Sequence, residues 1–590
     1  MTSPRGGGRA GNTVARFDRA SFTGVERFTY IGDGTLGAKA SGLARLLHLL
    51  DENVAPEFKP TISVDIPRLT VISTNIFDQF LEQNELRDLA ETLDSDATIA
   101  QVFRKAELPT EVVQNLRAFL SRVNTPLAIR SSSLLEDTMG EPLAGVYATR
   151  MTPNNQSALE DRLNSLIRGI KYVYASTFMT KAKDYLSAVR RSSREEKMAV
   201  VIQEVVGVAY EERFYPHISG VARSHNFYPL GLAQPGDGVV DLALGLGKTV
   251  VEDGIAWSYS PAYPHVSPPY NTVRDLLKQT QRVFWAIDMV DHPDPPSADR
   301  VDYLRQYELS LAEQDGALDL LASTYRPGDD KVMIGIGGTG PRILNFAPIL
   351  KADALPLTPL LQRLLNECEQ ALGNMVAIEF AVNLSHGGST PARLGFLQAR
   401  PMVVSEMLVE VPAQLLASDK VLVASESALG NGRIRTVQNI VYLKPEVFDV
   451  AHSRMIGQEL ETINRSLLAQ KAPYLLIGFG RWGSSDPSAG IPINFGQISG
   501  ARVIVEATLP NINFMLSQGS HFFHNLTSFK ILYFSVSHAG PYQVDWRWLG
   551  MQLPVAETQF VRHVRTSTPL DIKVDGRTGR GVILKGGARQ

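Results

Sequence analysis

The sequence predicts a mixed α/β protein, of the α/β or α+β class. From Phe28 onward, short runs rich in Val, Ile and Phe alternate with stretches whose apolar residues recur at helical spacing. The 590 residues are 44% hydrophobic and 20% charged, with a mean hydropathy of -0.06. A chain of this length and composition can bury several cores, so we expect more than one compact unit.

Charge, cysteine content and the length of apolar runs exclude several classes of protein. The formal net charge is -3 and the pI is about 6.4, which argues against nucleic acid as a partner. The single cysteine, Cys368, excludes an intramolecular disulfide framework and a cysteine-rich zinc site, and it favours a cytoplasmic location. No apolar run approaches the roughly 18 residues of a membrane-spanning helix, so we expect no membrane partner.

Periodicity and residue type place the secondary structure along the chain. Strands are expected at RLTVIS (68–73), PLAIRSS (126–132), MAVVIQEVV (198–206), KVMIGIG (331–337), MVAIEFAV (375–382), LGFLQARPMVV (394–404), ARVIVEATL (501–509) and FKILYFSV (529–536). Helices are expected at residues 43–52, 76–94, 110–123, 156–189, 271–290, 357–372 and 451–470.

Two motifs in the first part of the chain suit phosphate binding. The turn YIGDGTLGAKASGLARLL (30–47) presents Lys39 at the start of an amphipathic helix, where glycines, a helix N-terminus and a cation all favour a phosphate. The strand in PLAIRSSSLLEDT (126–138) delivers Arg130 beside three serines, and an arginine can hold two phosphate oxygens at once. The first motif also fits a flexible loop with a solvated lysine.

A carboxylate inside an apolar strand suggests a cation site. MVAIEFAVN (375–383) places Glu379 among Val, Ile and Phe, and LGFLQARPMVV follows with Gln398 and Arg400. A buried carboxylate is costly unless it is paired or binds a cation, and Mg²⁺ with ATP would satisfy it. An ion pair between Glu379 and Arg400 on neighbouring strands is the alternative.

Two further glycine motifs are rejected. VVDLALGLGKTVVEDG (239–254) has Leu242 where a phosphate loop needs glycine. GIGGTG (335–340) matches the dinucleotide pattern, but Pro341 follows and no helix opens after it. We therefore reject the first as a P-loop and interpret the second as a turn-rich loop.

Taken in order, the motifs resemble the N-terminal ATP-binding domain of the pyruvate phosphate dikinase and phosphoenolpyruvate synthase family. The resemblance covers roughly residues 28–405 and rests on LGAKASGLARL, AIRSSSLLEDT, LAGVYAT, VVIQEVV, LALGLGKTVVEDG, AIEFA and FLQARPMVV. It implies an ATP-grasp-like fold that holds ATP with Mg²⁺ between two lobes. By the resemblance, Lys39 and Arg130 would contact the ATP phosphates, and Gln203 and Glu204 would lie near the adenine. Glu379 and Gln398 would bind the metal and the phosphates. Arg400 would stabilise the charge of the transferring group.

The chain departs from the family pattern at several positions. Lys248 stands where the family usually has Glu, and Ala377 replaces the first acid of an Asp-x-Glu pair, which leaves Glu379 alone. VARSHNFYP (221–229) follows the family's Gly-Val-x-Phe-Thr pattern only loosely. The chain also lacks a Thr-Ser-His phosphohistidine motif and the length for a pyruvate-binding barrel of about 250 residues.

Composition and resemblance together divide the chain into six segments. The expected segments are a disordered basic arm (1–25), a first ATP-grasp-like lobe (26–200), a second lobe (201–405), a linker (406–420), a C-terminal mixed α/β domain (421–565) and a basic tail (566–590). The arm is rich in Gly, Arg, Ser and Thr and has no apolar period, so it is either a solvated tail or a contact for an acidic partner.

The C-terminal region contains two candidate polar segments. GFGRWGSSDPSAGIP (478–492) suits a rigid polar loop at a ligand or domain interface, or a structural turn. QGSHFFHNLTSF (518–529) places His521 and His524 three residues apart, and a histidine can accept a phosphoryl group or bind a metal. Two partly buried structural histidines are the alternative.

These features lead to two functional hypotheses. The first is an ATP-dependent phosphotransferase that transfers a phosphoryl group from Mg-ATP to His521 or His524, to a partner protein or to another acceptor. Lys39, Arg130, Glu379, Gln398 and Arg400 favour this enzyme. The second is a nucleotide-sensing regulatory or scaffolding protein with little turnover, which Lys248 and Ala377 favour.

Overall fold

The computed structural model describes residues 14–134, 145–188, 194–226, 233–252, 254–267, 273–278, 280–290, 303–385, 390–402, 409–482, 490–493, 495–510, 531–576 and 578–585. Within these ranges the chain forms several sheets and many helices, which confirms the mixed α/β class. None of the helices in these ranges combines the length and apolar character needed to cross a bilayer.

The first lobe is built on a six-stranded sheet. Its order is β1 (Ala15–Arg16), β2 (Phe28–Ile31), β4 (Leu69–Ile72), β7 (Met198–Glu204), β5 (Leu127–Ser133) and β6 (Thr149–Thr152). Its helices are α3 (Thr74–Gln83), α4 (Leu86–Thr92), α5 (Asp96–Lys105), α6 (Thr110–Leu120), α7 (Leu159–Ser176) and α8 (Thr180–Ala188). Residues of β7 alternate between two cores, because successive side chains of a strand point to opposite faces.

The second lobe contains the other six-stranded sheet of this part of the chain. Its order is β12 (Trp257–Tyr259), β11 (Val239–Ala243), β10 (Ile218–Arg223), β18 (Val376–Asn383), β19 (Ala392–Pro401) and β3 (Ile62–Asp65). Helices α1 (Gly37–Leu49), α2 (Ala55–Phe58) and α13 (Leu357–Leu372) share one apolar core with it. Strand β3 precedes β4 in the chain yet pairs with β19, so the two lobes are interleaved.

Two smaller sheets complete the second lobe. One has the order β14 (Leu304–Glu308), β13 (Val283–Asp288), β9 (Arg213–Tyr215) and β8 (Val208–Tyr210), and the other β16 (Lys331–Ile334), β15 (Ala322–Arg326) and β17 (Arg342–Leu344). The short helices are α9 (Lys248–Val251), α10 (Val273–Lys278), α11 (Leu309–Gln314) and α12 (Ala347–Leu350).

The C-terminal part forms a separate pair of main sheets. The larger has the order β21 (Ala428–Leu429), β28 (Leu532–Val536), β27 (Ala501–Ala507), β24 (Tyr474–Phe479), β23 (Asn439–Leu443), β30 (Val561–Arg565) and β29 (Pro554–Glu557). The smaller has the order β20 (Val421–Ser425), β32 (Arg580–Leu584), β31 (Asp571–Asp575) and β22 (Gly432–Ile434). The remaining elements are α14 (Ala413–Leu416), α15 (Ser453–Ala469), α17 (Trp546–Met551) and the pair β25 (Arg481–Trp482) and β26 (Gly490–Ile491). Strands β23, β24, β27 and β28 are parallel.

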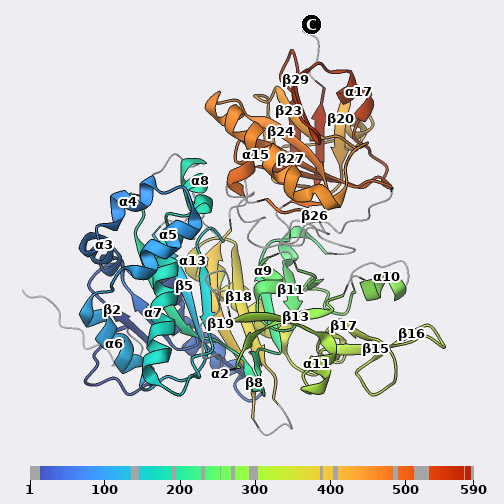
Figure 1. Cartoon of the computed structure of the whole chain (residues 1–590). Coiled ribbons are helices and arrows are strands. Elements are labelled where there is room, and N and C mark those ends of the chain that lie inside the picture. Colours follow the sequence, from blue (N-terminus) through green and yellow to red (C-terminus); the bar gives the residue numbers. More distant parts are fainter. Residues whose placement is uncertain are drawn as a thin grey trace, which may run out of the picture.

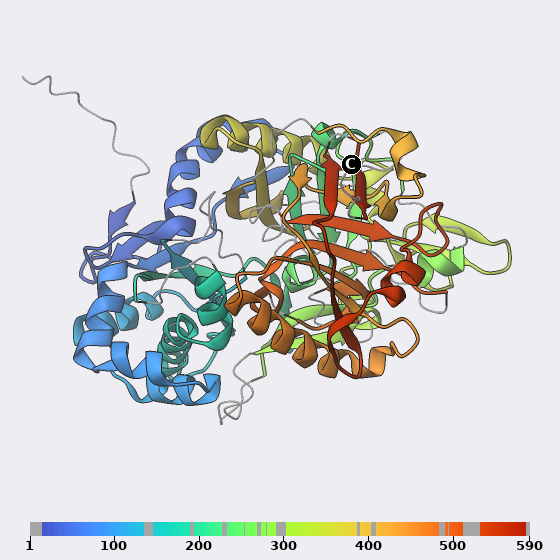
Figure 2. The same ribbon diagram turned by 90° about the horizontal axis from the view of Figure 1, so that it is seen from above.

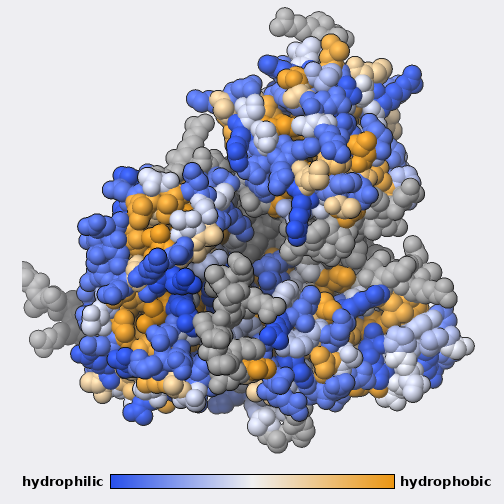
Figure 3. Space-filling view, viewed as in Figure 1, coloured by the Kyte–Doolittle hydropathy of each residue, from blue (hydrophilic) through white to orange (hydrophobic). Residues whose placement is uncertain are grey.

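Figures 1 and 2 show how these parts are arranged. The first lobe, in blue and teal, lies beside the second lobe, in green and yellow, and the orange and red C-terminal sheets lie above them (Figure 1). Seen from above, the C-terminal sheets overlie the second lobe, with the first lobe to one side (Figure 2). The face drawn in Figure 3 is mostly hydrophilic, with hydrophobic residues in separate patches.

Three sequence expectations differ from the structure. Residues 14–25, expected in the mobile arm, include β1 and bury Phe17 and Phe22, whose rings lie 4.7 Å apart at the centroids. Two aromatic side chains packed on the lobe outweigh the low periodicity of that segment.

The other two differences concern a helix and the tail. Residues 283–288, expected within a helix, form β13, because the run VFWAID alternates about a buried Phe284 and pairs with β9 and β14. The basic tail expected over 566–590 contributes β31 and β32, which pair with each other and with β22 and β20. In β31 the apolar residues Ile572 and Val574 alternate with charged ones, and in β32 residues 581–583 are a continuous buried run, so both strands of this hairpin pack against the domain.

Candidate nucleotide site

Arg130 connects the sheets of the two lobes. Its Nη1 donates to the side-chain oxygen of Gln203 (3.3 Å) and to the carbonyl of Leu397 (3.1 Å). Its Nη2 donates to Gln398 Oε1 (2.8 Å) and to Glu379 Oε2 (3.3 Å). Strand β5 therefore delivers one guanidinium to the centre of the β18–β19 pair, and four of the predicted residues form one cluster.

Strand register places the acidic and amide residues of this cluster in one row. Across β11, β10, β18 and β19, the paired residues are Asp241, Val221, Glu379 and Gln398. Directly paired residues of antiparallel strands lie on the same face of a sheet. The row therefore forms part of one surface, and a bulge after Glu379 shifts the register beyond it.

A second row lies beside the first and contains two arginines. Arg223 of β10 pairs with Ala377 of β18, which pairs with Arg400 of β19. Arg400 is 2% exposed, and its Nη2 lies 3.9 Å from Glu379 Oε1. The ion pair considered from the sequence is thus present, but its distance is at the outer limit of such contacts and Arg130 is the nearer partner of Glu379.

Two buried polar atoms in this cluster have no hydrogen-bond partner. They are Arg400 Nε and Gln203 Nε2, on side chains that are both 2% exposed. Leaving a buried donor unsatisfied costs about 1–3 kcal/mol, so such atoms are uncommon in native proteins. Their presence beside Arg130 marks this surface as a place where a polar ligand would complete the hydrogen bonding.

Lys39 lies near the end of the same strand. Its Nζ donates to the carbonyl of Ser131 (3.2 Å) and lies 3.4 Å from Ser131 Oγ. Ser132 Oγ donates to the carbonyl of Leu36 (2.9 Å) and accepts from the amide of Ala40 (3.2 Å). The serines after Arg130 therefore fix the start of α1, and with it the position of Lys39, which the sequence alone did not show.

The glycine-rich turn serves internal packing. The amide of Gly34 donates to Asn75 Oδ1 (2.9 Å), and that of Thr35 donates to Thr74 Oγ1 (3.1 Å). Gly37 has a φ of +74°, and a Cβ there would overlap the carbonyl oxygen of Ser132. These glycines allow the turn to contact β5 and the start of α3. From the sequence, we expected the glycines to let the backbone approach a phosphate.

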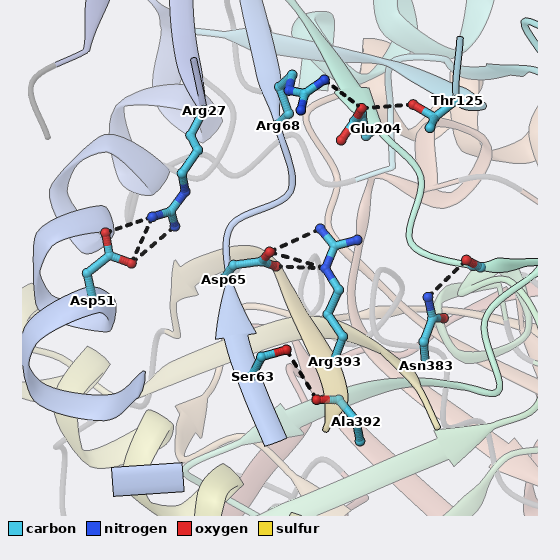
Figure 4. Close-up of polar contacts among 11 residues, drawn as sticks. Arg27, Asp51, Ser63, Asp65, Arg68, Thr125, Glu204, Asn383, Ala392 and Arg393 are labelled. Carbon is cyan, nitrogen blue, oxygen red and sulfur yellow. Dashed lines mark hydrogen bonds and ion pairs between the residues drawn. The ribbon is translucent and has the colours of Figure 1, made fainter. Parts of the chain in front are cut away.

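Glu204 lies apart from the cluster. Its carboxylate accepts from Arg68 (3.2 Å) and from Thr125 Oγ1 (2.8 Å), as Figure 4 shows. Gln203, the preceding residue, contacts Arg130 instead. Neighbouring residues of a strand point to opposite faces, so only Gln203 shares the surface with Glu379.

Residues 34–415, which contain this cluster, match a known protein family. The family model described as the pyruvate phosphate dikinase AMP/ATP-binding domain matches residues 34–415, which is more than half of the chain. The chain belongs to this pyruvate phosphate dikinase AMP/ATP-binding domain family. The match ends near the start of the C-terminal sheets, so the resemblance stated from the motifs is confirmed and the C-terminal region lies outside it.

A curated relative gives a second, more distant comparison. The "Uncharacterized phosphotransferase YvkC" of Bacillus subtilis (strain 168) is 24% identical over 190 residues. The aligned part covers 32% of this chain and 20% of the relative. The chain therefore matches about a fifth of that protein's length.

Two of the departures from the family pattern, Lys248 and Ala377, can be located in the structure. Lys248 begins α9, where its Nζ lies 3.6 Å from Glu252 and 4.4 Å from the ring centroid of Trp285. Its charge is thus engaged by a carboxylate and an aromatic face. Ala377 lies directly between Arg223 and Arg400.

The residues present fit one magnesium ion held mainly by a nucleotide. In the part of the chain that the structure describes, no group of three His, Cys, Asp or Glu side chains is arranged to hold a metal. Glu379 offers one carboxylate, and Gln398 offers an amide oxygen beside it. Mg²⁺ is commonly bound by one or two carboxylates together with phosphate oxygens, so this donor set is compatible with Mg-ATP.

The structure does not describe the predicted acceptor histidines. His521 and His524 lie outside the described residues, as do residues 483–489 of the other polar motif. The strands that precede the two motifs, β27 and β24, are parallel neighbours. Their carboxyl ends therefore meet at one edge of the C-terminal sheet.

Proposed function

We propose that the chain is an ATP-dependent phosphotransferase whose nucleotide lies on the surface formed by Arg130, Glu379, Gln398 and Arg400. The convergence of Arg130 on Glu379 and Gln398 across two sheets is the observation that supports it. Membership of an AMP/ATP-binding domain family supports ATP as the nucleotide. An ATP-grasp-like closure of the two lobes and a cytoplasmic location are part of the same proposal.

Each residue has a physical role in this proposal. Arg130 and Lys39 neutralise phosphate charge, and Arg400, held in a buried position, stabilises the charge of the transferring group. Gln203 contributes its unpaired amide to the nucleotide, while Glu204 supports the end of β7 through Arg68. Mg²⁺, when bound at Glu379 and Gln398, supplies further neutralisation of the phosphates.

The proposed acceptor is one of three groups. His521 or His524 of the C-terminal domain, a partner protein or a small molecule would receive the phosphoryl group. The C-terminal sheets lie above the two lobes, on the side of α9 (Figure 1), and this arrangement supports the C-terminal domain as a candidate acceptor.

A regulatory protein that binds ATP without turnover is the second candidate. Ala377 removes one carboxylate from the surface, and Lys248 is held by Glu252 and Trp285. Fewer metal ligands favour binding over transfer, because phosphoryl transfer depends on charge neutralisation.

The experiment combines binding with turnover. The full chain is heated with and without Mg-ATP, in wild type, Lys39→Ala, Arg130→Ala and Arg393→Ala. Arg393 is a matched control, because it lies on β19 like Arg400 but pairs with Asp65 of β3 (3.1 Å; Figure 4). We expect ATP to raise the melting temperature of wild type and Arg393→Ala only. Equal stabilisation of all four proteins would contradict the proposed site.

Turnover separates the two candidates. Wild type and Arg400→Ala are incubated with Mg-ATP and a cell extract freed of small molecules, and AMP, ADP and phosphate are resolved by chromatography. AMP or ADP that depends on Arg400 supports the phosphotransferase. Binding without either product supports the regulatory protein.

A further inference from the structure

Two departures from the family pattern face each other across one strand pair. The segment VARSHN places Arg223 where the family pattern has Phe, and Ala377 stands where it has Asp. The structure pairs Arg223 directly with Ala377, and Ala377 directly with Arg400. Each departure makes the surface one charge more positive, and both lie on the face that carries Glu379 and Gln398.

The side chain of Arg223 is only partly satisfied. Its Nη1 donates to Asp241 Oδ2 (2.6 Å), and its side chain is 13% exposed. Asp241 also accepts from Ser258 Oγ, so its carboxylate is shared. Arg223 Nη2 is buried and has no hydrogen-bond partner. An arginine with one nitrogen free of protein acceptors can still donate to an anion.

The spacing of the two arginines suits a chain of phosphates. Directly paired residues of adjacent antiparallel strands lie about 5 Å apart, so the two spacings across β18 separate Arg223 from Arg400 by about 10 Å at the backbone. Ala377 lies between them and presents only a methyl group. Long guanidinium side chains on both sides of a small residue leave room for successive phosphate groups of a nucleotide.

We propose that Arg223 is a further polyphosphate-binding residue, which together with Arg400 flanks Ala377 and replaces the metal-bridged contact that a second carboxylate would provide. The inference rests on the proposed function, because it assigns Arg223 to the same nucleotide. Fixed guanidinium groups neutralise phosphate charge without a cation. Nucleotide binding by this chain is therefore only weakly dependent on Mg²⁺.

The test measures binding of two probes to the full chain by titration calorimetry. ATP and inorganic tripolyphosphate are titrated in excess Mg²⁺ and in EDTA. The variants are Arg223→Met, which keeps the length of the side chain without its charge, and Ala377→Asp, which keeps Arg223 and restores the acid. The matched control is Arg213→Met, whose arginine forms a buried pair with Asp315 at 2.8 Å on the separate sheet of β9.

We expect wild type and Arg213→Met to bind ATP in EDTA with nearly the affinity seen in Mg²⁺. Arg223→Met should weaken binding of both probes in EDTA about tenfold or more, the scale of one charge-assisted contact, and Mg²⁺ should restore part of the loss. Ala377→Asp should make binding depend on Mg²⁺, because the new carboxylate lies between Arg223 and Arg400 and competes with the phosphates for their unpaired nitrogens.

The outcomes separate this inference from the proposed function. If ATP binds wild type and Arg130→Ala removes binding, but Arg223→Met and wild type bind equally in EDTA, the inference is wrong and the nucleotide site stands. If wild type does not bind ATP at all, both are wrong. Should Arg223→Met fail to fold, Ala377→Asp decides, and unchanged affinity of that variant in EDTA overturns the inference.

Discussion

Two buried arginine–aspartate pairs of the second lobe resemble each other in burial and length but differ in how completely the arginine is bound. Arg213 donates to Asp315 through both Nη2 (2.8 Å) and Nε (3.4 Å). Arg223 donates to Asp241 through Nη1 alone (2.6 Å), and its Nη2 has no partner. Side-chain exposures are 12% and 8% in the first pair, 13% and 5% in the second.

The surroundings extend this contrast. Asp315 also accepts from Tyr215 (2.7 Å), and the guanidinium of Arg213 lies 5.5 Å from the ring centroid of Tyr307. The hydrogen bonds that Arg213 donates to Asp315 raise the pKa of the arginine. The first pair is complete within the protein, so it stabilises the fold. The second pair keeps hydrogen-bonding capacity, which is the property expected where a ligand binds.

The largest expected effect tests this contrast through stability. Arg213→Met leaves Asp315 buried without its cation and removes the contact with Tyr307, so we expect a loss of about 3–5 kcal/mol in the free energy of unfolding. Arg223→Met also relieves an unsatisfied donor, so its loss should be smaller, about 1–3 kcal/mol. Denaturant titration of both variants without ligand measures the difference. A larger loss in Arg223→Met would assign the structural role to the wrong pair.

The next effect concerns the backbone that positions Lys39. Gly37→Ala would place a Cβ against the carbonyl of Ser132 at a φ of +74°, so we expect a loss of about 1–3 kcal/mol and weaker ATP binding. Gly42→Ala lies in the same helix, where the new Cβ would be 3.7 Å from the carbonyl of Ala399. That control should be neutral or stabilising, because alanine has a higher helix propensity than glycine.

Thermal melting and ATP titration of both glycine variants check this prediction. If Gly37→Ala melts and binds like wild type, the contact between the turn and β5 does not position Lys39. If Gly42→Ala lost as much stability as Gly37→Ala, α1 would tolerate neither substitution. The contrast between its two glycines would then disappear.

The sequence predicted where the strands of the site lie, but it did not predict which strands pair with one another. Val- and Ile-rich runs located β5, β7, β18 and β19. The motifs, and then the resemblance, selected Arg130, Glu379, Gln398 and Arg400, which the structure brings together. These strands can be recognised from the local sequence, because a strand buried on both faces is a continuous apolar run. The few polar residues that interrupt such a run are then the candidates for the site.

The rest depends on contacts between distant parts of the chain. Arg223 and Ala377 are separated by more than 150 residues, and no local period reveals that they pair. The pairing of β3 with β19 is equally non-local, and so is the burial of Phe17 and Phe22 on the first lobe. Gln203 and Glu204 are neighbours in β7, so their side chains point to opposite faces of the sheet and contact different partners. The resemblance implied the same place near the adenine for both residues and did not take this alternation into account.

A smaller effect is available from the single cysteine. Cys368 of α13 is buried, and burial, with a further contribution from Glu367, raises the pKa of its thiol to about 12. At pH 8 the thiol should therefore react with an alkylating reagent only after local opening of the second lobe. Arg213→Met should accelerate alkylation more than Arg223→Met, by about tenfold for each 1.4 kcal/mol of lost local stability.

Mass spectrometry of Cys368 follows this reaction without interference from other thiols. Saturating ATP should slow alkylation in wild type and in Arg213→Met, since both retain the nucleotide surface. Rapid alkylation of the native wild type would contradict the burial of Cys368 and remove this measure of the contrast.

The smallest expected effect sets the pH at which the two pairs should be compared. Burial, with a contribution from Arg565, lowers the pKa of His563 in the C-terminal domain below its ordinary 6.5, and burial also lowers the pKa of His225 in the second lobe. An unfolded chain then binds more protons than the folded one as the pH falls through 6.5. The contribution of both histidines to the free energy of unfolding is therefore fully present above pH 6.5. It is lost as the pH falls from 6.5 through their lower folded-state pKa values.

Variants at each histidine separate the two regions. His563→Gln can keep a hydrogen bond to Asn439, whose Oδ1 lies 3.1 Å from His563 Nε2. It should flatten the acid loss of C-terminal stability, which hydrogen exchange of the β23 and β30 amides measures. His225→Gln should flatten the acid rise in Cys368 alkylation instead. If His563→Gln changed the alkylation of Cys368 between pH 5 and 7, the two regions would unfold together, and the arginine pairs could no longer be compared independently of the C-terminal domain.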